Sequence, residues 1–126
     1  MTVLDASAIL ALVHDEPGAD AVAERLGGAV IGAANLAEVV GKLVDAGLDA
    51  SRLRGLLSAT GVVIKSLTAD DGELAGSLRV LPGGESLSLG DRCCLALTVR
   101  HDPPEVLTAD RAWADLDLPI RVTVIR

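Results

Sequence analysis

The sequence predicts an α/β fold, a three-layer α/β/α sandwich around a central and mostly parallel sheet, from three observations. Short runs of Val, Ile and Leu alternate along the chain with longer stretches of helical periodicity. The short runs are apolar throughout rather than at every second residue, which is typical of parallel strands buried on both faces. No internal repeat or linker divides the 126 residues, so residues 1–126 are expected to form one domain with one hydrophobic core.

Five segments are expected to be strands, because Val, Ile and Leu dominate them and short stretches of other residues separate them from their neighbours. In chain order they are Thr2–Asp5, Val30–Gly32, Val62–Lys65, Glu105–Leu107 and Ile120–Ile125. The amphipathic segments between them are expected to be helices that join successive parallel strands. These helices are Ser7–His14, Gly18–Leu26, Ala34–Ala46, Ala50–Thr60, Asp70–Leu81, Gly90–Arg100 and a short one from Arg111.

Composition limits the core and the possible ligands. Half of the residues are hydrophobic but only 1% are aromatic, so Leu, Val, Ile and Ala must build the core around the single large ring of Trp113. The net charge of −7 opposes binding of nucleic acid by charge alone, so a phosphate substrate would need a cation. Cys93 and Cys94 are adjacent in an apolar helical stretch and are expected to be reduced core residues.

No segment of the sequence predicts export or membrane insertion. The apolar start, Val3-Leu4, is interrupted by Asp5 and lacks the basic and long apolar regions of a secretory signal. The uninterrupted apolar runs are far shorter than the roughly 20 residues that cross a bilayer. The sequence therefore predicts a cytoplasmic protein that does not bind a membrane.

Two acids follow strands at the edge of the sheet where ligands bind in parallel α/β folds, beyond the carboxyl ends of the strands. Asp5 closes the first strand, and Asp110 follows the strand Glu105–Leu107 after two residues. Each also has a structural interpretation as a helix cap. Asp5 could cap the next helix, although Ser7 could do so as well, and Asp110 could cap the short helix that carries Trp113.

Two further acids, Glu38 and Asp91, lie in helical segments. Glu38 is opposite the apolar stripe of its helix, where Lys42 four residues later is a ready surface partner. Asp91 precedes an almost wholly apolar helix, where a carboxylate needs a helix N-terminus, an arginine or a metal. Because Ser88 and Asp91 match a capping box, capping and metal binding are both open for Asp91. The four acids together favour a divalent metal site, since a parallel sheet brings their segments toward one edge.

At four places in order, the sequence resembles the PIN-domain nucleases, and most closely the VapC toxins of bacterial toxin–antitoxin pairs. The matching segments are Val3-Leu-Asp-Ala-Ser7, Asn35-Leu-Ala-Glu38-Val39, Leu87-Ser-Leu-Gly-Asp91-Arg-Cys-Cys-Leu-Ala96 and Leu107-Thr-Ala-Asp110-Arg-Ala-Trp113. One motif of this length would be weak, but four spread across nearly the whole chain make the resemblance specific.

The resemblance implies a PIN fold with a cluster of metal-binding and catalytic acids. These acids are carried over to Asp5, Glu38, Asp91 and Asp110. Some relatives carry a further acid in the last helix, for which Asp115 is the better placed candidate and Asp117 the alternative. Because all of these ligands are oxygen atoms, Mg²⁺ suits the site, with Mn²⁺ as the alternative, rather than zinc.

The activity implied is that of a Mg²⁺-dependent endoribonuclease, a hydrolase of RNA phosphodiester bonds that uses a metal-activated water. Ser7 and Thr108 are expected to orient the site through their hydroxyl groups. Arg92 and Arg111, each beside a site acid, are candidate phosphate contacts, with a local salt bridge as the alternative.

The resemblance also implies partners. These are the RNA substrate, a cognate VapB-like antitoxin whose tail occupies the acidic groove through an arginine or lysine, and a second copy of the chain in a homodimer. Two other functions are alternatives: a catalytically silent PIN-like binding module, and a haloacid-dehalogenase-like phosphotransferase. The latter wants a second Asp two residues after the first, where this chain has Ser7.

Overall fold

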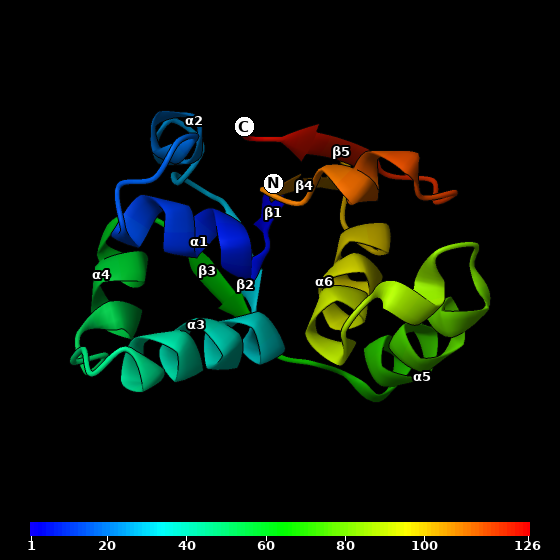
Figure 1. Ribbon diagram of the computed structural model, residues 1–126, viewed down its shortest axis with the longest axis horizontal. Helices are drawn as coiled ribbons and strands as arrows, with labels where there is room; N and C mark the ends of the chain where they lie inside the picture. The colour runs from blue at the N-terminus through cyan, green and yellow to red at the C-terminus, as the bar shows by residue number, and fades with distance from the viewer.

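Five parallel strands form the central sheet, in the order β3-β2-β1-β4-β5 (Figure 1). The structure is a computed structural model and describes residues 1–126. The strands are β1 (Thr2–Leu4), β2 (Val30–Gly32), β3 (Val63–Lys65), β4 (Glu105–Thr108) and β5 (Arg121–Val124). All four neighbouring pairs are parallel. The predicted parallel sheet and its five predicted strands are therefore confirmed.

Helices cover the sheet on both faces, which confirms the predicted three-layer sandwich. The α-helices are α1 (Ala6–Val13), α2 (Ala19–Ala23), α3 (Ala33–Asp45), α4 (Leu53–Ala59), α5 (Ala69–Ser77) and α6 (Leu89–Val99). The 3-10 helices are η1 (Leu78–Val80), η2 (Gly84–Ser86) and η3 (Arg111–Asp115). In Figure 1, α1, α3 and α4 gather on one side of the strands, and α5 and α6 on the other.

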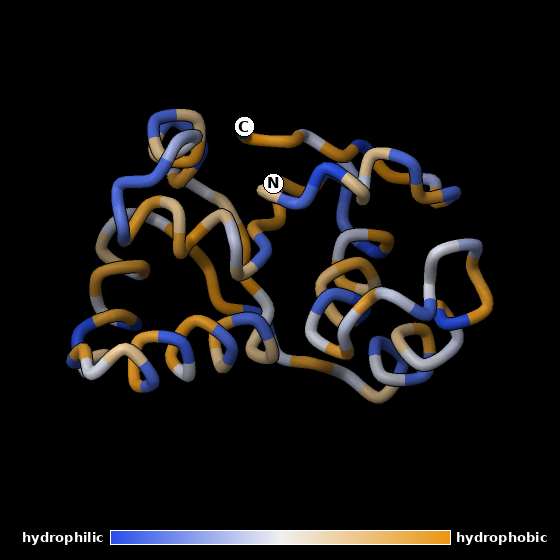
Figure 2. The backbone as a smooth tube through the Cα atoms, viewed as in Figure 1, coloured by the Kyte–Doolittle hydropathy of each residue, from blue (hydrophilic) through white to orange (hydrophobic).

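The side chains of the strands alternate between two hydrophobic clusters. Val3 and Val30 belong to the cluster that includes α6 and Trp113, whereas Leu4 and Ile31 belong to the cluster that includes α1, α3 and α4. Figure 2 accordingly shows the strands as largely hydrophobic stretches of the chain. Burial on both faces explains why the inner strands β1, β2 and β4 have consecutive apolar residues, whereas the edge strands β3 and β5 are more exposed.

Several helix boundaries differ from the predicted ones for local reasons. The helix predicted over Ala50–Thr60 begins three residues late, at Leu53, because the Asp49 carboxylate accepts the Ser51 N–H at 2.9 Å and holds the preceding residues in a turn. The helix predicted over Asp70–Leu81 divides into α5 and η1. The helix predicted over Gly18–Leu26 shortens to α2.

Two further predictions concern cysteines and membranes. Cys93 and Cys94 are buried and form no disulfide, as predicted. No helix of the protein combines the length and hydrophobicity that crossing a bilayer would require.

The strand order reverses between β1 and β4. From β1 the chain first adds β2 and β3 on one side, and it later adds β4 and β5 on the other. Such a reversal of strand order is where parallel α/β sheets bind ligands, beyond the carboxyl ends of the strands. The chain leaves β1 into α1 and β2 into α3, and α6 packs against α3, so the starts of three helices meet at this edge.

Candidate metal centre

Asp5 is buried at the carboxyl end of β1, directly before α1. Its Oδ1 accepts hydrogen bonds from the Ser7 hydroxyl at 2.7 Å and from the Ala8 N–H at 2.8 Å. Its Oδ2 accepts a hydrogen bond from the Thr108 hydroxyl at 2.6 Å. Asp5, and not Ser7, is therefore the N-cap of α1.

The ionised form of Asp5 is disfavoured where it lies. Burial raises the pKa of Asp5 and the negative charge of Asp91 adds to the rise, although hydrogen bonds from Thr108, Ser7 and Ala8 oppose both. No salt bridge of the protein involves Asp5. Asp5 is thus a buried carboxylate that the protein surrounds with hydrogen-bond donors but not with a positive charge.

The Thr108 and Ser7 hydroxyls connect Asp5 to the end of β4. Thr108 Oγ1 accepts the Asp110 N–H at 3.0 Å, and Ser7 Oγ accepts the Ala109 N–H at 2.9 Å. Asp110 lies at the surface and caps η3, because its Oδ1 accepts the N–H of the second η3 residue at 3.0 Å. The structural interpretation of Asp110 as a cap therefore holds, and Thr108 links it to Asp5.

Asp91 is in the first turn of α6 and closes the capping box that the sequence predicts. Its N–H donates to the Ser88 hydroxyl at 3.0 Å, and its Oδ2 accepts the Ser88 N–H at 3.0 Å. Its Oδ1 has no hydrogen-bond partner within the protein. Capping therefore occupies one oxygen of Asp91 and leaves the other for a ligand.

Glu38 is half-buried on α3 and faces the start of α6. Its Oε1 accepts a hydrogen bond from the Asn35 amide at 2.7 Å, and no salt bridge joins it to Lys42. The same Asn35 nitrogen donates to the Gly90 carbonyl at 3.0 Å. The alternative of a solvated acid paired with Lys42 is therefore wrong. Sequence reasoning gave Asn35 and Gly90 no role, although a polar residue three positions before Glu38 was a usable signal.

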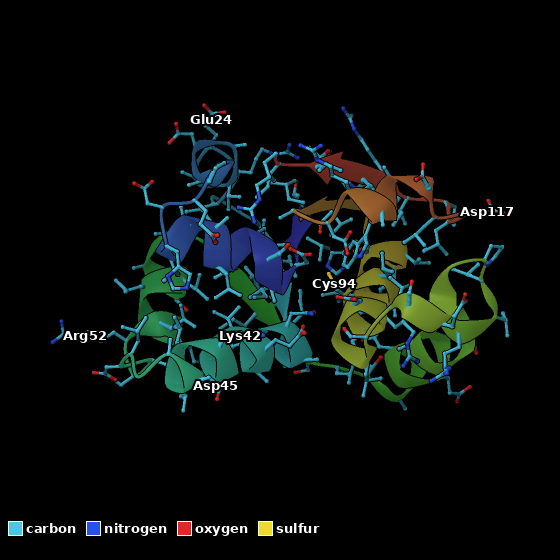
Figure 3. The ribbon with its side chains drawn as sticks, viewed as in Figure 1. Glu24, Lys42, Asp45, Arg52, Cys94 and Asp117 are labelled. Carbon is cyan, nitrogen blue, oxygen red and sulfur yellow. The ribbon has the colours of Figure 1, made fainter.

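Three of the acids lie close enough to influence the same buried thiol, and the carboxylate of one of them, Glu38, lies directly against Gly90, the residue before Asp91. Burial first, and then the charges of Asp5, Asp91 and Glu38, raise the pKa of Cys94 well above its ordinary value. Cys94 lies in the middle of α6, and Figure 3 labels it. Carboxylates that follow β1 or belong to α3 and α6 thus share one region at the edge of the sheet.

Two predicted residue pairs lie apart from this cluster. Asp115 is exposed at the end of η3, in a cleft between η3 and the residues around η2. Asp117 lies at the outer end of the molecule, away from Cys94 (Figure 3). Arg92 and Arg111 form no salt bridge with a site acid. Arg92 is buried and donates to a backbone carbonyl of α5 at 3.0 Å, and Arg111 donates to the carbonyl of Arg126 at 2.9 Å.

The donor set suits a hard divalent cation. In Glu38, Asp91 and Asp110, one carboxylate oxygen accepts a hydrogen bond and the other has no partner in the protein. Oxygen atoms without a paired cation are the ligands that Mg²⁺ and Mn²⁺ prefer. In this structure, however, no group of three His, Cys, Asp or Glu side chains is spaced closely enough to hold one metal ion. The acids therefore form a region with the right chemistry but not a closed coordination shell.

Comparison with known proteins defines the class. The family model of the PIN domain matches residues 2–118, so the chain belongs to the PIN domain family. PIN domains are generally nucleases that use divalent metals.

Among solved structures, the chain is similar to a toxin–antitoxin complex from Klebsiella pneumoniae. The TM-score is 0.78 and the sequence identity 20%, over 100% of this chain and 98% of that chain. At this identity the similarity establishes the fold. A search of curated proteins found no match.

Proposed function

We propose that this protein is a Mg²⁺-dependent endoribonuclease that acts as the toxin of a toxin–antitoxin pair, with residues 1–126 as its single PIN domain. One observation carries the proposal. Asp5 lies at the carboxyl end of β1 and the Glu38 carboxylate lies against Gly90, beside Asp91, in a PIN-family chain, and no salt bridge neutralises any of the three acids. Uncompensated carboxylates are costly unless a ligand supplies positive charge.

In this proposal the acids hold Mg²⁺, or Mn²⁺ in its place. The free oxygens of Glu38, Asp91 and Asp110 are available to it, together with the remaining lone pairs of Asp5. A bound cation of this kind would lower the pKa of the attacking water and offset the charge of the phosphate. Ser7 and Thr108 would keep Asp5 oriented through their hydroxyl groups. Asp115 is the remaining candidate ligand, although it lies in the cleft beside η3.

The choice of an antitoxin as partner has separate support. One solved structure that the chain resembles is a toxin–antitoxin complex, and its fold covers the whole of this chain. A cognate VapB-like antitoxin would place an arginine or lysine of its tail among the acids, where the positive charge of that side chain substitutes for the metal. Homodimerisation and a cytoplasmic location remain part of the proposal.

A catalytically silent PIN-like binding module is the second candidate. It is favoured by the absence of three suitably spaced metal-binding side chains and by the capping roles of Asp91 and Asp110. Such a module would bind RNA or the antitoxin without cleaving a phosphodiester bond. The phosphotransferase alternative is not carried further, because the chain belongs to the PIN family and has Ser7 where that chemistry wants an acid.

Cleavage of total RNA with and without Mg²⁺, followed by mapping of the new ends, tests the proposal. Asp5→Asn and Asp91→Asn retain a side-chain oxygen that can cap their helices, and each should lower the cleavage rate by about 100-fold or more. Asp45→Asn is the matched control, because it removes the same charge from an exposed position on α3 and should leave the rate unchanged. Wild-type rates in both site variants would contradict the mechanism. RNA binding without cleavage at any metal concentration would favour the silent module.

A further inference from the structure

Asn35 connects two of the elements that carry site acids. It lies in the first turn of α3 with only 2% of its surface exposed. Its amide nitrogen donates to Glu38 Oε1 at 2.7 Å within the same helix, and to the Gly90 carbonyl at 3.0 Å across the gap to α6. A side-chain amide has two protons, so these two bonds use both of them. Asn35 therefore ties Glu38 to the backbone of the residue that precedes Asp91.

Gly90 leaves room for the Glu38 carboxylate. A Cβ atom built on Gly90 would lie within 2.5 Å of the carboxyl carbon and both oxygens of Glu38, closer than such atoms approach in proteins. The carboxylate thus occupies the space that a side chain at position 90 would fill. Since Glu38 has neither a salt bridge nor any other hydrogen bond from a side chain, Asn35 and Gly90 are what fix its position.

We infer that Asn35 and Gly90 form a positioning unit, here called the Asn35–Gly90 bridge, that sets the separation of Glu38 and Asp91 for a shared divalent cation. The inference rests on the proposed metal site. Asn35 is a positioning residue, because its amide directs both protons to the protein and it acts on a cation only through Glu38. Groups that orient a ligand in this way typically contribute about 10–100-fold to metal affinity.

A purely structural role for Asn35 makes a different prediction. If Asn35 only joined α3 to α6, its loss would weaken cation binding equally whether or not Glu38 is present. If Asn35 acts through Glu38, the loss of Asn35 should have no further effect once Glu38 has been removed, because the two substitutions then interrupt the same interaction. The combination of Asn35→Ala with Glu38→Ala therefore separates the two roles.

The experiment measures Mn²⁺ affinity by electron paramagnetic resonance titration up to millimolar concentrations, on the full chain and without RNA. Asn35→Ala and Gly90→Ala should each weaken Mn²⁺ binding by about 10–100-fold. Adding Asn35→Ala to Glu38→Ala should change the affinity of Glu38→Ala by less than about twofold. Gly41→Ala is the matched control, since a Cβ atom at this α3 glycine meets nothing within 4 Å, and it should bind as the wild type does.

The outcomes separate this inference from the proposed function. If wild-type protein binds no Mn²⁺, both are overturned. If wild-type protein binds Mn²⁺ but Gly90→Ala binds equally well, or if Asn35→Ala weakens binding equally with and without Glu38, only the Asn35–Gly90 bridge is overturned. Thermal melting shows which variants are folded. Should Asn35→Ala not fold, Gly90→Ala decides the question, because it requires only the flexible end of Glu38 to move.

Discussion

Each end of the central sheet contains one buried carboxylate, and the two are stabilised in opposite ways. Where the strands begin, Glu105 of β4 is 7% exposed; where they end, Asp5 after β1 is 5% exposed. Both accept a hydrogen bond from a threonine hydroxyl, Thr2 for Glu105 and Thr108 for Asp5. Only Glu105 has positive partners, a salt bridge to Arg25 and a second to Arg121 at 3.4 Å. Both carboxylates thus accept hydroxyl hydrogen bonds, but Asp5 lies deeper within the protein and only Glu105 has positive partners.

The pKa values of the two groups move in opposite directions. Burial opposes ionisation of Glu105, but hydrogen bonds from Thr2, Arg25 and Thr123 and the charge of Arg25 outweigh it, so the pKa of Glu105 is lowered. Burial dominates at Asp5 and raises its pKa. Arginines of the protein therefore neutralise the charge of Glu105, as in a structural ion pair. No cation of the protein neutralises the charge of Asp5, as expected of a ligand site.

The largest effect is expected from Glu105→Gln. This substitution removes the charge that Arg25 and Arg121 face, and it should lower the free energy of unfolding by about 1–3 kcal/mol at pH 7. Urea unfolding followed by circular dichroism measures the change. Glu24→Gln is the control, because Glu24 is an exposed acid beside Arg25 and is labelled at the surface in Figure 3.

The pH dependence of the Glu105→Gln effect has a defined sign. Because the pKa of Glu105 is lower in the folded protein than its ordinary value of 4.5, its contribution to stability is present above that value and is lost as the pH falls through the lowered pKa. The difference between wild type and Glu105→Gln should therefore shrink in acid. A difference that stays constant or grows as the pH falls would contradict the assignment of Glu105 as a paired acid.

The sequence predicts the fold well because the strands are buried on both faces. Val30–Gly32 is apolar at every residue and the other strands each contain at least two Val, Ile or Leu residues, so their positions can be predicted without neighbours far along the chain. Helix ends were less predictable. Whether α4 begins at Ala50 or at Leu53 depends on one hydrogen bond, from Ser51 N–H to the Asp49 carboxylate, which competes with the first turn of the helix.

The sequence predicts the site acids that come just after strands. Asp5 and Asp110 could be placed at one edge because Asp5 directly follows a parallel strand and Asp110 comes just after another. The position of Glu38 could not be derived from its own helix, since the contact that fixes it comes from Gly90, which is 52 residues later. The pairing of Glu105 with Arg25 was missed for the same reason, because the two residues are 80 positions apart.

The expected phosphate contact of Arg92 illustrates a limit of arguments from adjacency. Arg92 follows Asp91 directly in the sequence, but consecutive residues of an α-helix point about 100° apart. Asp91 therefore faces the start of α6 and Ser88, whereas Arg92 is buried against α5 and donates to the carbonyl of Ala75. Neighbouring residues on a helix do not share a site unless both faces of the helix contribute to it.

A smaller effect is expected from Asp91→Ala in metal-free buffer. This acid belongs to the uncompensated end of the sheet, yet it also caps α6 together with Ser88. Loss of the cap should lower the free energy of unfolding by about 1 kcal/mol, and thermal melting with EDTA present measures it. Asp91→Asn keeps an oxygen for the Ser88 N–H and should melt close to the wild type. A higher melting midpoint for Asp91→Ala would mean that repulsion among the acids outweighs the cap.

The smallest effect, and the one of opposite sign, is expected from Asp5→Asn. The amide retains an oxygen that can accept from Ser7 and Ala8, and it removes a charge that burial disfavours, so the free energy of unfolding at pH 7 should rise, by less than about 1 kcal/mol. Because the pKa of Asp5 is raised in the folded protein, its contribution is greatest below the ordinary value of 3.8 and is lost as the pH rises through the raised pKa. In EDTA, the free energy of unfolding of Asp5→Asn should therefore rise relative to wild type as the pH increases from acid to neutral. Over the same pH range, the free energy of unfolding of Glu105→Gln should fall relative to wild type. Saturating Mn²⁺ should reverse the order by stabilising only the wild type. If Asp5→Asn is instead less stable than wild type at neutral pH without metal, the two ends of the sheet do not differ in the way that their charges indicate.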